Sequence, residues 1–557
     1  MVLVVDVAWS PPSTDLHRDA WLDTLMPHGI PCVHVHVDDD TEPTVALRAQ
    51  WIVRSFEFDE ARPFAVVLAP TPRPPGLAPL YAMPWLPTQA ALVDRDEQLA
   101  VWSRDRAEAQ KSAAARRRAI ARSARHGWYA RPDLPRVFEE GLTAIKVAVG
   151  LNWAGTTPFP GPACPATIAL LLASARRGDR EAAALADAAL TRIAISGLRD
   201  HLGGGFFHDL GDGISRTPDF ARTATENAAL LDLFSAAAVE LDRPDFAEVA
   251  REIAGFLLGT LRDPASRLFC CRQAADDAYY TWSTREVMAV VPFDRVNVAC
   301  LHFDIQPGGG PLADPGKNVL YVAMNADELA PYIGESPEVA AIQVNEAKAA
   351  MAEARASRPA PSLDRISYVN VNALVVAALL AGAARLDEPS WTEAALGSLE
   401  ALRQRCQASG RWVVPHRLDR PAADQEHHLA DYAALGRALL AAFEATGGRH
   451  FLDNAVALAP TLSETFCEPS SGALLDVPRS ALVSRAFWLE QAFEDTAGPS
   501  PAALAVQFLL DLHRCSGEPT ALDTAANSLR AGAKAALDDP PAAAGYFLAV
   551  DQLLHIS

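Results

Sequence analysis

Cysteine is scarce in this sequence, and no two cysteines stand in the Cys-x-x-Cys spacing. Eight cysteines in 557 residues do not make the dense disulfide scaffold of a small secreted protein. The adjacent pair Cys270 and Cys271 is interpreted as two separate thiols, because vicinal cysteines are more often separate than bonded. The sequence therefore favours a reducing compartment, and we expect a cytoplasmic protein.

The sequence also lacks a charge-free run of about 18 apolar residues, which is the length that a membrane-spanning helix needs. The apolar run at residues 2–5 is short, is broken by Asp6 and has no basic flank, so it does not predict a signal peptide. The formal net charge of −20 disfavours nucleic acid and acidic membrane surfaces as partners. We therefore expect neither a nucleic-acid nor a membrane partner.

Helix formers, above all alanine and leucine, are abundant, so we expect a mainly α protein. Half of the residues are hydrophobic, which is enough for more than one domain. In the first hundred residues, short strand-like runs alternate with segments of helical spacing, in the order 2–5, 14–26, 32–37, 44–53 and 64–68. This order predicts a small α/β domain. A proline-rich stretch at 70–87 then predicts a break in regular structure.

A basic segment rich in arginine, alanine and lysine follows at 104–126. It could bind an anionic ligand or RNA, but within so acidic a chain we favour a solvated linker helix. The predicted organisation is an α/β domain at 1–103, a basic helical linker at 104–134 and a helical domain at 135–557.

The helical domain repeats a turn followed by a helix. The turns begin near residues 178, 241, 386, 447 and 517, so the copies are 60 to 70 residues apart with one gap of 145. Each unit has the length of a helical hairpin with a loop, and the long gap predicts a sixth, altered unit around 300–356. Six hairpins predict a closed toroid, an (α/α)6 barrel. The alternative is an open array of helix pairs.

The segment Gly197–Gly213, GLRDHLGGGFFHDLGDG, is unusual in its glycine and polar content. Its glycines allow backbone conformations that are closed to other residues and let the chain approach a ligand closely. Its histidines and aspartates surround these glycines in a loop, and loops often carry function. The segment therefore predicts the floor of a pocket.

The order of motifs resembles a known family. The matching residues include Asp200, His201, the Gly203–Phe206 run, Asp212, Pro218, Phe220, Asn227, Tyr280, Trp282, Asn318, Leu363, Asp364, Asn372, Asp431, Tyr432 and Pro499. On these residues the chain resembles the spermatogenesis-associated protein 20 family, which joins a thioredoxin-like domain to an (α/α)6 barrel like that of N-acylglucosamine 2-epimerases. The resemblance runs over nearly the whole length and implies a thioredoxin-like fold for the predicted α/β domain.

The chain departs from the family where the chemistry would lie. The place of the family's Cys-His-Trp-Cys motif falls near residues 8–11, which hold no thiol, and Cys32 stands in a predicted strand. Because disulfide exchange needs a thiolate, we expect a redox-inactive N-terminal domain. In the barrel, Asp219 stands where the family has histidine, and Ala221 where it has glutamate. These losses suit a relaxed demand on the ancestral chemistry.

The candidate site residues follow from the motifs. The candidate catalytic residues are Asp200, His201, Asp219 and Glu226, and the candidate ligand-binding residues are Gly204, Phe206, Gln273, Asn372, Asp431 and Tyr432. His201 could equally be a neutral histidine bonded to the loop backbone. Asp219 and Glu226 could share acid and base work, but capping and solvating a helix start is slightly favoured. His427 and His428 face different sides of a helix and lack a spaced third ligand, so no metal is predicted, and no cofactor either.

The leading hypothesis is a divergent family member whose barrel keeps a pocket for a small polar, sugar-like metabolite. The resemblance implies isomerase-like or epimerase-like proton transfer, or hydrolysis, if the protein is an enzyme. The competing hypothesis is a non-catalytic pseudoenzyme that acts as a scaffold or as a binding subunit with a protein partner. A cavity lined with aromatic rings and several carboxylates would favour the enzyme, and one filled by Ile366, Val371 and Ala221 would favour the scaffold.

Overall fold

The structure is a computed structural model of the full chain. It describes residues 2–7, 32–37, 64–72, 75–84, 132–153, 165–208, 218–310, 314, 316–408, 411–420, 425, 427–476, 478, 493, 495 and 500–556. The chain divides into two compact units. One unit comprises Met1–Arg131 and Glu464–Ala492, and the other comprises Pro132–Ser463 and Phe493–Ser557. Most of the predicted linker, the predicted helices at 14–26 and 44–53 and the place of the thiol motif lie outside the described residues.

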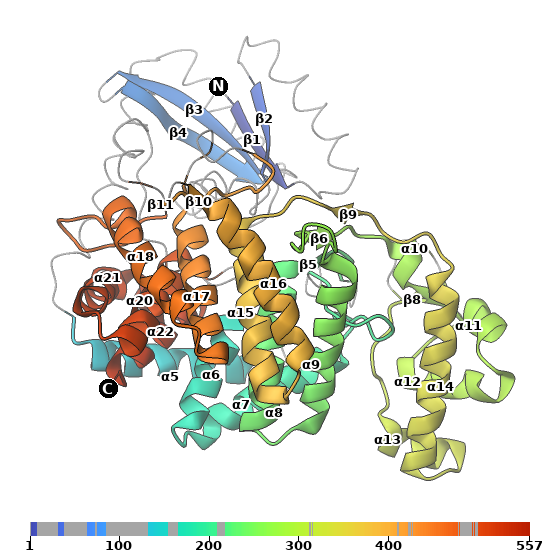
Figure 1. Ribbon diagram of the computed structural model, residues 1–557. Helices are drawn as coiled ribbons and strands as arrows, with labels where there is room; N and C mark the ends of the chain where they lie inside the picture. The colour runs from blue at the N-terminus through green and yellow to red at the C-terminus, as the bar shows by residue number, and fades with distance from the viewer. Residues whose placement is uncertain are drawn as a thin grey trace. The chain divides into compact units, whose positions relative to one another are not determined.

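The N-terminal unit contains a four-stranded mixed sheet in the order β2-β1-β3-β4 (Figure 1). Strands β1 (Val2–Val7) and β2 (Cys32–Val37) run parallel, so a crossover must join them. Strand β3 (Phe64–Pro72) is antiparallel to β1, and β4 (Pro75–Pro84) is antiparallel to β3. The three predicted strand runs are therefore strands.

The expected break at 70–87 is wrong, because β3 and β4 form a hairpin there. Proline lacks the N–H that a central strand must donate, but an edge strand tolerates it. Strand β4 is the edge of the sheet, and it holds Pro75, Pro79 and Pro84. The sequence alone does not show that the strand with these prolines lies at the edge of the sheet, where it pairs with only one other strand.

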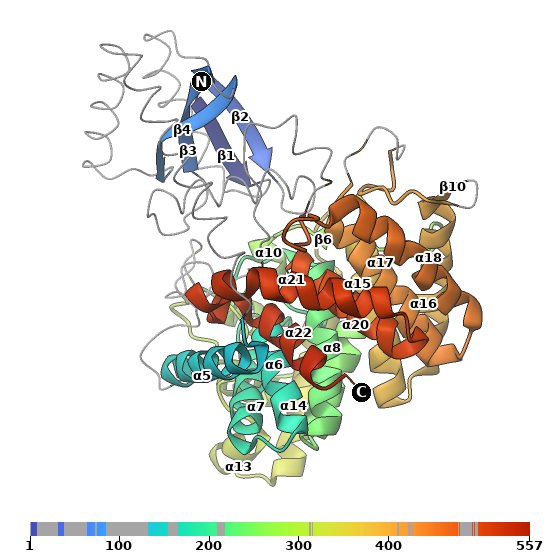
Figure 2. The same cartoon turned by 90° about the vertical axis from the view of Figure 1, so that its left-hand side faces the viewer.

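Six helices of the second unit form a closed inner ring (Figures 1 and 2). Each contacts the next, in the order α6 (Pro165–Arg176), α8 (Ala224–Glu240), α15 (Val369–Leu386), α17 (Leu429–Thr446), α20 (Pro501–Ser516) and α22 (Ala544–Leu554), and α22 returns to α6. An outer helix accompanies each in the chain: α5 (Leu134–Trp153), α7 (Arg180–Ile195), α9 (Pro244–Phe256), α16 (Pro389–Cys406), α18 (Arg449–Phe466) and α21 (Pro519–Asp538). This closed ring confirms the predicted (α/α)6 toroid and excludes the open array.

The five predicted turns are the short connections that lead from an inner helix to the next outer helix. Each holds one residue in the left-handed region of φ, namely Gly178, Asp242, Asp387, Gly447 or Gly517. Glycine adopts this conformation freely, and aspartate adopts it more readily than most residues. The repeat in the sequence therefore marks the same feature each time: an inner helix that ends at a residue in the left-handed region of φ.

The sixth hairpin was predicted in the wrong place. It is formed by the two ends of the helical domain, because the first helix, α5, packs against the last, α22. The segment around 300–356 belongs instead to an insertion between α9 and α15, which we call the insertion (residues 277–356). It contains α11 (Thr284–Val290), α12 (Val296–Phe303), α13 (Ala326–Ile333) and α14 (Pro337–Ala356). The insertion has its own small core around Trp282, Phe303 and Met351.

The core of the barrel lies between the two rings. Outer helix α7 is amphipathic and buries Ala182, Ala186, Leu190 and Ile193 along one stripe. Inner helices are apolar on nearly all sides, and α8 buries Leu231, Phe234 and most of its other residues. Each fully buried leucine or phenylalanine contributes about 1.5–3 kcal/mol to stability.

Helix α15 alone among the described helices is long and apolar enough to cross a membrane. Its sequence carries a single charge, Arg385, and 61% of the helix is buried inside the protein. It packs between α8 and α17 in the inner ring, which accounts for its apolarity as that of a core helix. The charge-free part of α15 is shorter than about 18 residues because Arg385 stands near the end of the helix, so the sequence did not indicate a membrane-spanning helix here.

Candidate functional site

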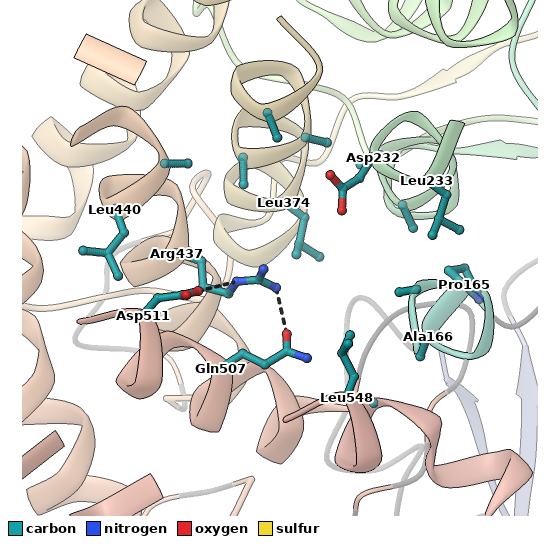
Figure 3. A pocket seen from close by; sticks show the side chains of 18 of the residues that line it. Pro165, Ala166, Asp232, Leu233, Leu374, Arg437, Leu440, Gln507, Asp511 and Leu548 are labelled. Atoms are coloured by element: carbon teal, nitrogen blue, oxygen red, sulfur yellow. Dashed lines mark hydrogen bonds and ion pairs between the residues drawn. The ribbon is translucent and has the colours of Figure 1, made fainter. Parts of the chain in front are cut away.

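An axial cavity of about 510 Å³ runs within the inner ring and is lined by all six inner helices (Figure 3). The apolar part of the lining consists of small residues and four leucines: Pro165, Ala166, Ala169, Ala228, Ala229, Leu233, Leu374, Ala377, Ala378, Ala381, Leu440, Ala441, Gly545 and Leu548. On α15, Leu374, Ala377, Ala381 and Arg385 recur at helical spacing on one face. The cavity exists because alanines occupy positions where larger side chains would close the axis.

Apart from Thr225 at the start of α8, the polar part of the lining comes from the middle and C-terminal ends of the inner helices. Arg437 donates to the side-chain oxygen of Gln507 at 3.0 Å and lies 4.0 Å from Asp511. Figure 3 shows Arg437 between these two side chains, with Leu374, Leu440 and Leu548 around it. Groups from α17 and α20 thus meet at one wall of the cavity.

Further ion pairs join neighbouring inner helices at this cavity. Arg385 donates to Asp232 at 2.6 Å, which joins α15 to α8. Arg514 pairs with Glu444, which joins α20 to α17, and Arg176 donates to Glu240 at 2.6 Å, which joins α6 to α8. Each of the four arginines on the wall therefore lies beside a carboxylate; Asp232, Glu444 and Asp511 line the cavity, and Glu240 does not.

The surroundings of Asp511 shift its pKa. Burial raises the pKa of Asp511 above its usual range, and the neighbouring Arg437 and Arg514 only partly offset that rise. Gln552 also donates to Asp511 at 2.7 Å. Asp511 is therefore the cavity residue whose environment best fits a proton donor.

The chemistry of this lining is that of a hydrogen-bonding site. Guanidinium groups donate, carboxylates accept, and the amide of Gln507 does both. Within the described lining there is no histidine and no aromatic ring. Ile366, Val371 and Ala221 do not fill the cavity either, so the lining has the carboxylates expected of an enzyme without the aromatic rings.

The predicted site residues lie elsewhere, because none of them is among the described residues that line the axial cavity. Asp200 stands in the glycine-rich loop between α7 and α8 and is 3% exposed. Its carboxylate accepts from Arg355 at 2.7 and 3.1 Å, from Arg222 at 2.9 Å, and from the backbone N–H groups of Leu202 and Gly203. Burial alone would raise the pKa of Asp200, but Arg355 and Arg222 lower it. The carboxylate is a buried anion that fixes the loop.

Arg222 connects Asp200 to two other predicted residues. It donates to the carbonyl oxygen of Gly204 at 2.6 Å and to the side-chain oxygen of Gln273 at 2.6 Å. The hydroxyl of Tyr280 also donates to Gln273, at 2.9 Å. Asp200, Gly204 and Gln273 are therefore brought together, around a buried arginine.

Gly204 has φ of +72°, and a Cβ atom there would lie 2.5 Å from the backbone oxygen of Glu252. Glycine is required at position 204 because the loop packs closely against the backbone of α9. Phe206 is 1% exposed and stacks on Phe234 of α8. Both residues serve the packing of the loop in this structure.

Two buried asparagines pin the loops that precede inner helices. Asn227 accepts from the backbone N–H of Phe206 at 2.7 Å and donates to its carbonyl oxygen at 3.0 Å. Asn372 does the same to Phe269, at 2.7 and 3.1 Å. Asn227 and Asn372 therefore make the same pair of hydrogen bonds, each to the backbone of one phenylalanine.

Asp431 and Tyr432 belong to a separate buried group at the start of α17. Asp431 accepts from the backbone N–H of Asn370 at 2.9 Å and pairs with Nδ1 of His416 at 2.9 Å. The hydroxyl of Tyr432 lies 3.2 Å from Nδ1 of His427. No group of three metal-ligating side chains is found among the described residues.

Glu226 and Asp219 lie at the start of α8. Thr223 caps this helix, and its hydroxyl donates to Glu226 at 2.6 Å. Glu226 also lies 2.8 Å from Nδ1 of His208. Asp219 accepts from the backbone N–H of Ala221 at 3.1 Å. These contacts fit the capping interpretation of Glu226, and a catalytic role for either carboxylate stays a prediction.

His201 is buried, and its Nε2 lies 3.0 Å from the carbonyl oxygen of Ser196, so this nitrogen carries the proton. Burial lowers the pKa of His201 to about 3, and the positive charge of Arg199 adds to the effect. The imidazole is therefore neutral at physiological pH, as the alternative interpretation of His201 proposed.

This burial predicts how stability depends on pH. The unfolded chain protonates His201 near its ordinary pKa, whereas the folded chain resists protonation until about pH 3. The contribution of His201 is thus fully present above about pH 6.5 and is lost as pH falls toward 3, by up to about 1.4 kcal/mol per pH unit. Compared with wild type, His201→Gln should show a shallower fall in a series of urea titrations across this range, because its amide does not titrate. Equal slopes would contradict the assignment.

The cavity residues carried one sequence signal that the motif search did not use. Asp232 in LLDLF, Arg437 in LGRALL and Asp511 in LLDLH are each the single charge in a short apolar run of an inner helix. A lone charge on a buried helix needs a polar neighbour or a cavity, so this pattern could have located the site.

The fold and cavity define a class of protein: an (α/α)6 barrel with a polar axial cavity. No family model matches the chain. It is similar to spermatogenesis-associated protein 20 of Homo sapiens, with 25% identity over 370 residues that cover 60% of this chain and 47% of that protein. The Mus musculus protein is 23% identical over 379 residues, covering 60% and 46%. These matches support a divergent member of the spermatogenesis-associated protein 20 family, and the chain spans about half the length of these curated relatives.

Solved structures that resemble the chain are helical sugar-processing proteins. A GH76 α-mannanase of Bacteroides thetaiotaomicron has a TM-score of 0.46 and 9% identity, covering 76% of this chain and 97% of that chain. A D-mannose isomerase has a TM-score of 0.43 and 9% identity, covering 70% and 84%. A cellobiose 2-epimerase of Spirochaeta thermophila has a TM-score of 0.42 and 15% identity, covering 70% and 84%.

Proposed function

We propose that the protein binds a small polar, sugar-like molecule in the axial cavity. The observation that carries the proposal is the cavity itself, which has arginine, carboxylate and amide groups on its wall and about 510 Å³ of space. This volume lies within the range of about 300–1,000 Å³ that is usual for small-molecule sites. A hydroxyl both donates and accepts, so hydroxyl groups suit a wall that alternates donors with acceptors.

The pairing of the arginines supports an uncharged ligand. Each arginine around the cavity already has a carboxylate partner, as in Arg385 with Asp232 and Arg514 with Glu444. A phosphate would compete with those carboxylates for the guanidinium groups. A neutral polyol can bond to the outer atoms of each pair, while Leu374, Leu440 and Leu548 cover its carbon atoms.

A catalytic role would use Asp511 as the proton donor, because burial raises its pKa and it lines the cavity. Isomerase-like or epimerase-like proton transfer, or hydrolysis, would each need a second group as base, and Glu444 and Asp232 are the carboxylates available on the described wall. The engagement of Asp200 and His201 in fixed contacts favours the second candidate, a non-catalytic binding subunit. Binding is common to both candidates and is the part that we propose.

We also propose that the N-terminal domain is a redox-inactive thioredoxin-like module and that the protein is cytoplasmic. A parallel β1–β2 pair followed by the antiparallel β3–β4 hairpin supports the fold. The absence of a thiol from residues 8–11 supports the loss of redox chemistry. Measurable turnover in an insulin-reduction assay would contradict the proposed loss of redox chemistry.

The binding proposal can be tested by thermal unfolding with a panel of neutral sugars, sugar acids and sugar phosphates. A ligand at about 100 times its Kd stabilises the folded state by about 2.7 kcal/mol, so at least one neutral sugar should raise Tm measurably. Ala377→Phe should abolish that rise, because Ala377 is a small, half-buried residue that faces the cavity.

The matched control is Ala535→Phe, which places the same side chain on the exposed face of the outer helix α21 and should keep the rise. Arg437→Met should weaken binding without closing the cavity. If no sugar raises Tm, or if Ala377→Phe and wild type respond equally, the axial cavity is not the binding site.

A further inference from the structure

The insertion presents apolar side chains to solvent that its small core does not use. Six of the ten large hydrophobic residues that are exposed in the described part of the chain lie there: Met288, Val290, Phe293, Tyr332, Val339 and Ile342. Phe293 is 92% exposed and Ile342 is 58% exposed. Exposed apolar side chains that gather on one element usually mark an interaction surface, whereas scattered ones need no explanation.

Three of these residues form one surface, which we call the insertion patch: Phe293, Val339 and Ile342. Val339 and Ile342 stand three residues apart on α14, and Glu346 follows on the same helical face. Phe293 belongs to the short 3₁₀ turn Phe293–Arg295, and Arg295 of that turn pairs with Glu346 at 2.7 Å. The ion pair brings the turn that carries Phe293 against the face that carries Ile342.

The rim of the insertion patch is acidic. Its acidic groups are Asp294, Glu335, Glu338 and Glu346, and Arg295 among them is already paired with Asp294 and Glu346. In the sequence, residues 318–347 contain five acidic residues and no lysine or arginine. A partner must therefore bring positive charge around its own apolar side chains.

We propose that the insertion patch docks a basic, amphipathic segment of another protein, with an apolar anchor that covers Phe293 and Ile342. Opposite charge at the rim speeds encounter and suppresses wrong partners, while the apolar centre supplies most of the binding energy. A second copy of this chain fits poorly, because a two-fold contact would place two acidic rims together. An anionic membrane is disfavoured by the same charge.

The experiment uses the full chain and a fluorescent helical peptide of about 18 residues, with leucines on one face and lysines on the other. Fluorescence anisotropy should show binding that weakens as salt rises. Phe293→Ser with Ile342→Ser should raise Kd by about tenfold or more. These residues are exposed, so the double variant should keep its Tm.

The matched control is Val147→Ser with Val239→Ser, which removes two valines of similar exposure, 56% and 58%, from α5 and α8. It should bind the peptide as wild type does. A peptide with glutamate in place of lysine should not bind. Equal binding by both double variants, binding of the glutamate peptide, or a dimer in sedimentation that Phe293→Ser with Ile342→Ser abolishes would each overturn the proposal. None of these outcomes depends on ligand binding in the axial cavity.

Discussion

Arg355→Met is expected to lower the free energy of unfolding of the barrel by about 3–5 kcal/mol, because it leaves a buried carboxylate without one of its two arginine partners. The side chains of Arg355 and Asp200 are 7% and 2% exposed, and they are joined by hydrogen bonds of 2.7 and 3.1 Å. Methionine has a similar length but no charge. Arg222 would remain, yet it is shared with Gly204 and Gln273.

The effect can be measured by urea denaturation followed by far-ultraviolet circular dichroism. The matched control is Arg136→Met, which removes an exposed pair with Glu140 on α5 and should cost less than about 0.5 kcal/mol. The Asp200 cluster also links the glycine-rich loop to the end of α14, since Arg355 belongs to that helix. If Arg355→Met costs no more than Arg136→Met, Asp200 does not depend on this pair for its burial.

Gly141→Leu is expected to cost about 3 kcal/mol by overpacking the contact that closes the ring. A Cβ atom at Gly141 would lie 2.0 Å from the ring of Phe547, which is fully buried on α22. Since α5 and α22 are the first and last helices of the barrel, the clash falls on the hairpin that the two chain ends form together.

The control for this variant lies on the same helix. Gly150 has nothing within 4 Å of an added Cβ atom, so Gly150→Leu should be neutral or slightly stabilising, because leucine favours helix more than glycine does. Thermal unfolding of the two variants should therefore differ clearly. Equal Tm values would mean that α5 does not pack on α22 and that the barrel is not closed there.

The sequence was sufficient to predict the barrel because its signal is local. Left-handed residues such as Gly178, Asp387 and Gly517 recur at the ends of inner helices, and their spacing counts the hairpins. The sixth hairpin left no such mark, because no turn joins α22 to α5. The segment around 300–356 was taken for it because that segment lies within the gap of 145 residues between two of the predicted turns.

The candidate site was harder to predict for a physical reason. A buried polar network and a catalytic site use the same kinds of residue, and Asp200, Asn372 and Asp431 are polar residues with fixed structural partners. The charged residues of the cavity wall, such as Asp232 and Arg437, come to line one cavity only because the inner helices pack into a ring. Their partners lie on other helices, between 64 and 153 residues away in the sequence, so no local motif contains them.

A crystal structure of the protein with the neutral sugar that raises Tm most would test the proposed binding site directly. The ligand should lie inside the inner ring, with hydroxyl groups within hydrogen-bonding distance of Arg437 and of Asp511 or Gln507. A ligand bound beside Asp200, His201 or Glu226, with the axial cavity free of it, would contradict the proposal and return the site to the glycine-rich loop.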